Sequence, residues 1–331
     1  MARIHGGPDH HGVPLHDFSS NSNSRGPCPA ALAAVQLADA SQYPDASYTA
    51  LRQQLADFHA VDVRRVLLAG SASEFIFRIT ALAAQRGASA VWLPPHGYGD
   101  YAQAARAWKL AAAAQPAQAQ LRWACDPSSP LGGAHAGLES LAEAGAWCVL
   151  DRAYEPLRLS EALALPHGIL QRFWQLWTPN KALGLTGVRA AYVIAPPGEG
   201  AAVAQLESLA PSWPVGAHGV AMLQAWTAAE AQAWLAECLP TLRQWKARQI
   251  ALCESLGWTC LDSQVNFFCA RPALPEGVSL QTALGLLRAQ SIKLRDTASF
   301  GLPGHVRVSV MSPAAQDALH NAWLGITEKA T

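Results

Sequence analysis

Short apolar runs alternate with longer amphipathic stretches from about residue 65 to residue 195. The runs have the length and apolar content of buried strands, and they lie at 65–69, 90–93, 121–125, 147–151, 173–178 and 188–195. Strands that alternate with helices in this way form a parallel sheet covered by helices on both faces. We therefore predict an α/β fold whose large domain has a mostly parallel sheet between helices.

After about residue 216 the pattern changes to that of a smaller α+β domain. Two long stretches rich in Ala, Leu, Gln and Trp predict helices, and a last helix is expected from about Pro313. Short strands are predicted between them, at 258–261, 266–270, 292–295 and 305–310. We expect three parts: an N-terminal arm over 1–42 that joins the small domain, a large domain over 43–215 and a small domain over 216–331. Residues 111–120 are expected to finish a helix or a loop.

The composition excludes several functions. Only 15% of the 331 residues are charged and 24 basic residues balance 24 acidic ones, so the charge pattern argues against binding to nucleic acid or an anionic membrane surface. A small neutral or zwitterionic substrate fits this balance better. No run of 18 apolar residues and no secretory signal is present, and the seven cysteines form no C-x-x-C motif. We expect a cytoplasmic protein with reduced thiols.

Candidate ligand-binding residues follow the predicted strands, because ligands of open α/β sheets bind at the carboxyl ends of strands. Residues 70–74 follow the first strand, and there Ser71 and Ala72 begin a helix whose free N–H groups can bind a phosphate. A serine N-cap without a ligand explains the same residues. Tyr98 follows the second strand in a Gly/Pro-rich turn, where its ring can lie over a flat cofactor or be part of an ordinary loop.

The next two strands end in polar turns. Residues 126–132 follow the third strand and include Ser129. The fourth strand ends at Asp151, with Tyr154 three residues later. A carboxylate at that place can keep a pyridinium nitrogen protonated, which makes the ring an electron sink. A helix N-cap is the alternative role of this aspartate.

The fifth strand leads into a loop that contains a lysine. Residues 178–189 include Thr178, Asn180, Lys181 and Arg189. A lone lysine is ordinarily a solvated surface residue, and the chain has four others, Lys109, Lys246, Lys293 and Lys329. Here the lysine belongs to a series of strand-end motifs, where a desolvated amine near cationic groups can form a Schiff base. Arg189 is suited to bind a phosphate through two hydrogen bonds.

The order of these motifs resembles the fold-type I pyridoxal-phosphate enzymes of the class I and II aminotransferase family, over nearly the whole chain. Within that family the chain is most similar to the histidinol-phosphate aminotransferases and to the threonine-phosphate decarboxylases of cobalamin synthesis. The S/T-x-x-K-x-x-G-x-x-G-x-R pattern of the family is matched by Thr178, Lys181, Gly184, Gly187 and Arg189. The resemblance implies an aspartate-aminotransferase-like fold and pyridoxal 5'-phosphate held as a Schiff base on Lys181.

The resemblance also implies roles for other residues around the cofactor. Thr178, Asn180 and Arg189 lie near the phosphate with Ser71 and Ala72, Asp151 pairs with the pyridine nitrogen, Tyr154 with the 3′-oxygen, and Tyr98 stacks on the ring. Tyr43 reaches the phosphate of the neighbouring subunit, which implies a homodimer. Three places depart from the pattern: Ser129 replaces the usual Asn beside the 3′-oxygen, Asn180 replaces a Ser, and Asn23-Ser24 replaces the common N-P after the amino-terminal strand. These changes affect the tuning of the cofactor more than its binding.

The resemblance implies substrate residues as well. Arg307 is similar to the arginine that receives the substrate carboxylate, and Arg295, Arg25 and Asn23 are further candidates for the carboxylate and phosphate. A surface salt bridge is the alternative role of Arg25 and Arg295. Segments 5–7, 17–23 and 295–302 resemble the cobalamin branch more than the histidine branch, which favours L-threonine O-3-phosphate decarboxylase. An aminotransferase of the histidinol-phosphate type is the alternative. In both reactions Lys181 acts as general acid/base.

Other classes fit less well. A non-catalytic binding module on the same fold is favoured by Ser129 and Asn180. The presence of Lys181, Asp151, Tyr154 and Arg189 together opposes it. A Rossmann dehydrogenase is excluded because no G-x-G-x-x-G follows the first strand. The histidines at 5, 10, 11 and 16 lack carboxylate or cysteine partners at ligand spacing, so no metal site is expected. The tryptophans are expected to pack in the core and at the dimer interface.

Overall fold

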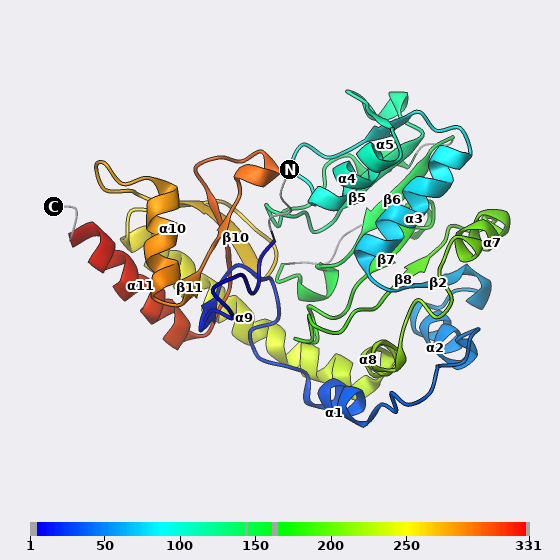
Figure 1. The fold of residues 1–331 in the computed structure, drawn as a ribbon, viewed down its shortest axis with the longest axis horizontal. Helices are drawn as coiled ribbons and strands as arrows, with labels where there is room; N and C mark the ends of the chain where they lie inside the picture. The colour runs from blue at the N-terminus through cyan, green and yellow to red at the C-terminus, as the bar shows by residue number, and fades with distance from the viewer. Residues whose placement is uncertain (1–4, 143–144, 161–164, 329–331) are drawn as a thin grey trace.

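A computed structural model describes residues 5–142, 145–160 and 165–328. Among these residues a seven-stranded sheet has the order β2-β8-β7-β6-β5-β3-β4 (Figure 1). Its strands are β2 (Val66–Ala69), β3 (Ala90–Trp92), β4 (Ala111–Ala112), β5 (Leu121–Cys125), β6 (Trp147–Asp151), β7 (Trp174–Trp177) and β8 (Ala191–Ile194). Only β8 runs antiparallel to its neighbours, β2 and β7. The predicted mostly parallel sheet is confirmed.

Helices cover both faces of this sheet, and the alternation of side chains along a strand shows how. Val66 and Leu68 of β2 point into one buried cluster, while Leu67 and Ala69 point into another. The first cluster includes residues of α1, α2, α8 and the start of α9 (Ala229–Ser255), and the second includes residues of α3, α4 and α7. The helices are α1 (Pro29–Leu37), α2 (Thr49–His59), α3 (Ala72–Gln85), α4 (Gly99–Ala107), α5 (Leu138–Leu141), α6 (His167–Leu170), α7 (Gly200–Ser208) and α8 (Ala217–Thr227).

A second lobe contains a four-stranded antiparallel sheet with the order β12-β13-β10-β9. Its strands are β9 (Thr259–Cys260), β10 (Phe267–Arg271), β12 (Arg295–Asp296) and β13 (Val306–Ser309), and its helices are α9 (Ala229–Ser255), α10 (Leu280–Ala289) and α11 (Pro313–Glu328). The N-terminal strand β1 (His16–Asp17) pairs in parallel with β11 (Ile292–Lys293), so the blue start of the chain lies beside the orange lobe in Figure 1. Single 3-10 turns are η1 (Val63–Arg65), η2 (Pro116–Gln118), η3 (Glu155–Leu157) and η4 (Ala298–Phe300).

Three predicted elements differ from the structure. The strand expected at 188–195 begins only at Ala191, because the Asn180 side chain holds the carbonyls of Thr186 and Val188 in the preceding turn. Residues 111–120 contain the edge strand β4 as well as the turn η2, so the prediction of a helix end or loop there was incomplete. The single strand expected at 292–295 is two strands, because β11 pairs with β1 and β12 pairs with β13.

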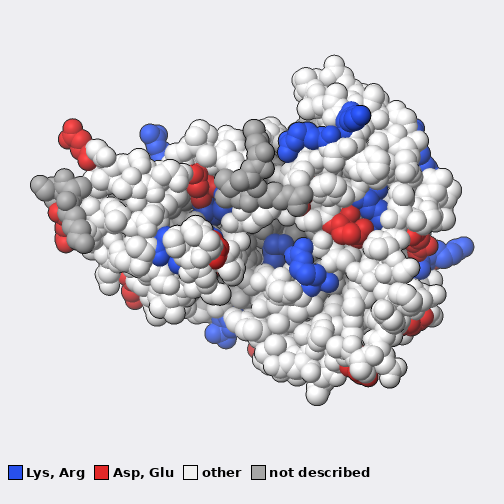
Figure 2. All heavy atoms as spheres, in the orientation of Figure 1, with Lys and Arg blue, Asp and Glu red and all other residues white. Residues whose placement is uncertain are grey.

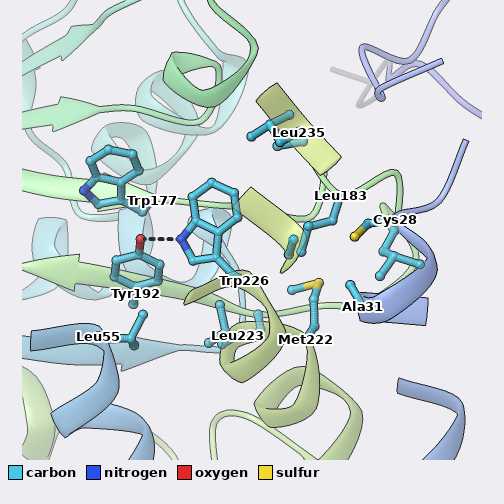
Figure 3. Packing of buried hydrophobic residues seen from close by; sticks show 14 of the residues in the cluster. Cys28, Ala31, Leu55, Trp177, Leu183, Tyr192, Met222, Leu223, Trp226 and Leu235 are labelled. Carbon is cyan, nitrogen blue, oxygen red and sulfur yellow. Dashed lines mark hydrogen bonds between the residues drawn. The ribbon is translucent and has the colours of Figure 1, made fainter. Parts of the chain in front are cut away.

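The cluster that holds the lobes together is drawn in Figure 3. The indole N–H of Trp226 on α8 donates to the hydroxyl of Tyr192 on β8, 3.0 Å away, and the Trp177 ring stacks parallel to Tyr192. Cys28 and Ala31 of the predicted arm belong to the same cluster. The core around the large sheet thus includes α8 and part of α9 from beyond residue 216. The domain boundaries at 42 and 215 stay predictions.

We expect the stability of the fold to depend on pH through His59, which contacts this cluster. Its Nε2 lies 2.8 Å from the Tyr192 hydroxyl, and burial, with the charge of Arg152, lowers the pKa of His59 to about 4. An unfolded histidine has a pKa of about 6.5, so between these values the unfolded chain binds more protons and stability falls as the pH falls. The free energy of unfolding should be about 2–3 kcal/mol lower near pH 4 than at pH 7.

Urea unfolding between pH 7 and pH 4 checks this prediction. His59→Gln should remove most of the extra loss below pH 6.5, since glutamine does not titrate. If the free energy of unfolding fell equally steeply with falling pH in the variant and in the wild type, groups other than His59 would be the cause of the acid sensitivity.

Candidate active site

A cavity of about 1460 Å³ lies between the carboxyl ends of the central strands and the small sheet. Figure 2 shows a hollow near the middle of the molecule with basic side chains at its edge. Most of the residues predicted from the sequence line this cavity: Ser71, Ala72, Tyr98, Ser129, Asp151, Tyr154, Thr178, Asn180, Lys181, Arg189, Arg295 and Arg307. The residues of the large domain meet because they lie at the carboxyl-end edge of its parallel strands, while Arg295 and Arg307 come from the small antiparallel sheet.

A buried carboxylate forms the floor of the cavity. Asp151 ends β6, and its Oδ2 accepts a hydrogen bond of 2.6 Å from the Tyr101 hydroxyl while Oδ1 accepts one of 3.0 Å from the Ala153 N–H. Burial raises the pKa of Asp151, although these two hydrogen bonds and the charge of Lys181 oppose the shift. A cationic N–H donor in the cavity would stabilise the ionised form, as the nitrogen of a protonated pyridine ring does.

The start of α3 offers a binding place for a phosphate. Ser71 is the N-cap, and its Oγ accepts from the Glu74 N–H at 3.1 Å, so the helix begins at the cavity wall. Thr178 Oγ1 and Asn180 Oδ1, which also line the cavity, are buried without a hydrogen-bond partner among the described residues. Buried polar atoms are normally paired, so these two atoms fit a ligand that brings its own hydrogen-bonding groups. Arg189 adds a positive charge to the lining of the cavity.

Lys181 reaches the cavity beside Tyr154. Its Nζ lies 5.3 Å from the centre of the Tyr154 ring, and the Tyr154 hydroxyl accepts a hydrogen bond of 3.1 Å from the Asn21 side chain. The side chain is half-buried and open to a ligand. Lys246 differs: burial lowers its pKa to about 8, but its Nζ donates to the Ser263 carbonyl and it does not line the cavity.

Two buried arginines lie directly opposite each other on the small sheet. Arg295 of β12 pairs with Arg307 of β13, and the residues are only 4% and 7% exposed. Arg307 donates to Ser129 Oγ at 3.3 Å and to the Ser19 carbonyl at 2.9 Å. Burial, together with the charge of Arg307, lowers the pKa of Arg295 to about 10. Like charges opposite each other are destabilising, so an anion bound between them would relieve the repulsion.

Three predicted residues are not brought to the cavity wall. The Asn23 side chain donates to the Ala182 carbonyl at 3.0 Å, and Arg25 is exposed with its guanidinium 6.0 Å from the centre of the Trp245 ring. Tyr43 is 77% exposed and stacks on Trp213 at a centroid distance of 4.3 Å. The substrate roles of Asn23 and Arg25, and the role of Tyr43 toward a partner subunit, stay predictions.

The sequence analysis did not select two residues that complete the site, Tyr101 and Asn21. Tyr101 stacks on Trp123 at 4.4 Å and donates to Asp151, while Asn21 donates to Tyr154. A signal for Tyr101 was its position three residues after Tyr98 at the start of a helix, which puts both rings on one face. In the described part of the chain no cluster of His, Cys, Asp and Glu could hold a metal, and no helix is long and apolar enough to cross a membrane.

Comparisons with known proteins agree with this geometry. The family model "Aminotransferase class I and II" matches residues 13–129 and 107–322. A histidinol-phosphate aminotransferase of Halorubrum lacusprofundi is 29% identical over 326 residues, covering 89% of this chain and 84% of the relative.

Two solved structures show the same fold. The L-threonine-O-3-phosphate decarboxylase of Porphyromonas gingivalis matches with a TM-score of 0.79 and 19% identity, over 95% of this chain and all (100%) of the other. The histidinol-phosphate aminotransferase of Sinorhizobium meliloti, in complex with pyridoxal-5'-phosphate, matches with a TM-score of 0.81 and 21% identity, over 97% and 93%. These matches confirm the predicted combination of a large α/β domain and a smaller α+β domain.

Proposed function

Because the chain belongs to the aminotransferase class I and II family and uses pyridoxal phosphate, we propose that it decarboxylates L-threonine O-3-phosphate. In this reaction carbon dioxide leaves the α-carbon and a proton takes its place. The observation that carries the proposal is the buried pair Arg295 and Arg307, one opposite the other on the cavity wall. Two fixed cations suit a small substrate with two anionic groups, a carboxylate and a phosphate.

The N-terminal segment gives further support. Asp9 forms ion pairs of 2.8 Å with Arg288 and 2.9 Å with Lys293, and Lys293 also donates to the Gly7 carbonyl at 2.6 Å. These contacts hold the segment 5–8 against the cavity. Gly6 is required there, because a Cβ would lie 2.1 Å from the Ser19 carbonyl oxygen. Residues of all three segments that resemble the threonine-phosphate decarboxylases, 5–7, 17–23 and 295–302, line the cavity.

The residues of the site fit the cofactor and suggest how each takes part. Pyridoxal phosphate supplies an electron sink that stabilises negative charge at the α-carbon. Asp151 would hold a proton on the ring nitrogen, and the start of α3 with Arg189 would bind the phosphate. Lys181 would carry the cofactor and then move a proton at the α-carbon. Burial raises the pKa of Tyr98 to about 12, so the phenol stays neutral and would cover the ring.

Transamination of histidinol phosphate is the second candidate, because relatives with that name match nearly the whole chain. That substrate carries a phosphate but no carboxylate at the reacting carbon, so a proton is lost there instead of carbon dioxide. The same arginine pair would then bind a single phosphate. The two reactions therefore differ in product and in their need for a keto acid.

A homodimer is also part of the proposal. Tyr43 and Trp213 form an exposed aromatic pair, and Leu37 nearby in the chain is 84% exposed. Exposed apolar groups of this size favour burial against another protein surface. The predicted cytoplasmic location stays a prediction. Sedimentation of the purified protein, with Tyr43→Ser as a variant, tests the dimer.

Product analysis tests the reaction. The purified enzyme with its cofactor is incubated with L-threonine O-3-phosphate labelled in the carboxyl group, and separately with histidinol phosphate and 2-oxoglutarate. We expect labelled carbon dioxide and an amino alcohol phosphate in equal amounts without any keto acid. Formation of glutamate from the second mixture, with no labelled carbon dioxide from the first, would establish the aminotransferase instead.

We expect Arg307→Gln to lower kcat/KM for L-threonine O-3-phosphate by about 10²–10³-fold, because removing one partner of a buried charge pair costs about 2–5 kcal/mol. Most of the loss should be in KM, since Arg307 binds the substrate in its ground state as well. Steady-state kinetics measures this, with Arg271→Gln as control, because Arg271 is an exposed arginine on the neighbouring strand β10. If Arg307→Gln and Arg271→Gln changed kcat/KM equally, the assignment of Arg307 to the substrate site would be wrong.

A further inference from the structure

His96 connects the large lobe to the small lobe beside the cavity. It lies in the loop between β3 and α4, two residues before Tyr98, and its Nδ1 is 2.7 Å from the carbonyl oxygen of Phe300 in the turn η4. A Cβ at Gly301 would lie 3.6 Å from the same nitrogen, so the turn packs against the ring. Figure 1 shows this turn, in orange, on the side of the small lobe that faces the large one.

The turn that His96 contacts supports Arg295. Arg295 donates to Ser299 Oγ at 2.8 Å, and its guanidinium lies 4.9 Å from the centre of the Phe300 ring. Arg307 also lies over Phe300, at 5.6 Å. Both arginines of the cavity wall thus rest on a turn whose last residue is bonded to His96.

The chemistry of the contact defines the role of His96. A carbonyl oxygen only accepts, so Nδ1 must carry the hydrogen. Hydrogen bonds inside η4, such as that from the Phe300 N–H to the Thr297 carbonyl at 2.9 Å, keep the turn itself compact. The contact with His96 therefore fixes the position of the turn relative to the large lobe rather than its internal shape.

We propose that His96 is a positioning residue for the substrate's anionic group: it holds η4, and through Ser299 and Phe300 it keeps Arg295 aimed into the cavity. The inference rests on the proposed function, because it assumes that Arg295 binds a carboxylate or phosphate of the substrate. It assigns no contact between His96 and the substrate or the cofactor.

His96→Phe removes the N–H donor and keeps a flat ring, while His96→Asn keeps a side-chain N–H. With the cofactor-loaded enzyme we expect His96→Phe to raise KM for L-threonine O-3-phosphate about five-fold to ten-fold, with kcat within about two-fold, since one hydrogen bond is lost. His96→Asn should recover most of the loss. His305→Phe is the matched control. The described hydrogen bond of the His305 side chain is a local one, to the carbonyl oxygen of Pro303 two residues earlier.

A double-mutant cycle tests whether His96 works through Arg295. In an Arg295→Gln background, His96→Phe should have no further effect on KM, because the group that it positions is gone. Independent, additive effects would overturn the inference, as would an unchanged KM in His96→Phe.

One further readout needs no turnover. Calorimetry with inorganic phosphate should show weaker binding to the cofactor-loaded His96→Phe variant than to the loaded wild type, because Arg295 is no longer held in place. Failure of the wild type to bind phosphate or to turn over substrate would defeat the proposed function. Phosphate binding to the wild type that is unchanged in His96→Phe would defeat the role of His96, whatever the substrate is.

Discussion

Replacing Lys181 with alanine is expected to lower kcat by at least about 10³-fold, because removal of a general acid/base alone costs about 10²–10⁴-fold. The loss should be at the upper end, since the same amine would also carry the cofactor. Among the described residues, Lys181 is the lysine that lines the cavity. The absorption spectrum of the variant with pyridoxal phosphate should be that of the cofactor without a covalent bond to the protein. Added methylamine should restore part of the activity.

Lys246→Met is the matched control for this variant. Lys246 has the lowered pKa that is common in reactive amines, yet it lies away from the cavity and bonds a backbone carbonyl. We expect its replacement to leave kcat within a few-fold of the wild type. If Lys246→Met abolished the visible absorption and Lys181→Ala did not, the assignment of the cofactor lysine would be wrong.

Asp151→Asn is expected to lower kcat by about 10²–10³-fold, the usual cost of removing one electrostatic contact to a developing charge. An amide has almost the shape of the carboxylate, so the hydrogen bond to Tyr101 can be kept while the negative charge is lost. Without that charge the ring nitrogen of the cofactor would lose its proton and the ring would withdraw electrons less well. Single-turnover rates and the dissociation constant of the cofactor should be measured together.

Tyr101→Phe separates the charge of Asp151 from its position. This variant leaves the carboxylate charged but removes the 2.6 Å hydrogen bond. We expect a smaller loss than for Asp151→Asn, about ten-fold, because a hydrogen bond to a charged group contributes about 1.5–3 kcal/mol and only part of it acts on the rate. A larger loss for Tyr101→Phe than for Asp151→Asn would contradict the role given to the carboxylate.

The large sheet could be predicted because each of its buried strands is an apolar run between turn residues. The direction of β8 could not be read from that pattern, since apolar periodicity is the same in both directions. The connection before it offered a signal: residues 178–190 contain Pro179, Gly184 and Gly187 and leave little room for the helix that a parallel crossover needs. This antiparallel return keeps Lys181 in a loop at the carboxyl end of β7.

The sequence predicts the part of the site whose residues directly follow strands of the large sheet. Asp151, Lys181 and Ser71 follow strands that are neighbours or near neighbours, so their meeting follows from the sheet. The opposition of Arg295 and Arg307 depends on the register of β12 and β13, which the sequence pattern does not contain. Arg25 was an equally good candidate by residue type, but it lies over Trp245 outside the cavity.

The contact between His96 and Phe300, which links the two lobes, could not be predicted from the sequence either. His96 and Phe300 are separated by 204 positions, and their contact depends on how the small sheet is placed against the β3–α4 loop. Polar contacts at such distances follow from the packing of whole elements rather than from local preferences.

Reduction with sodium borohydride, followed by peptide mass spectrometry, tests the central claim most directly. Reduction fixes pyridoxal phosphate permanently to the lysine that carries it, so the modified peptide identifies the residue. The account predicts modification of Lys181 in the wild-type enzyme, and its loss after prior addition of L-threonine O-3-phosphate. Modification of Lys246 instead, or of no lysine, would contradict it.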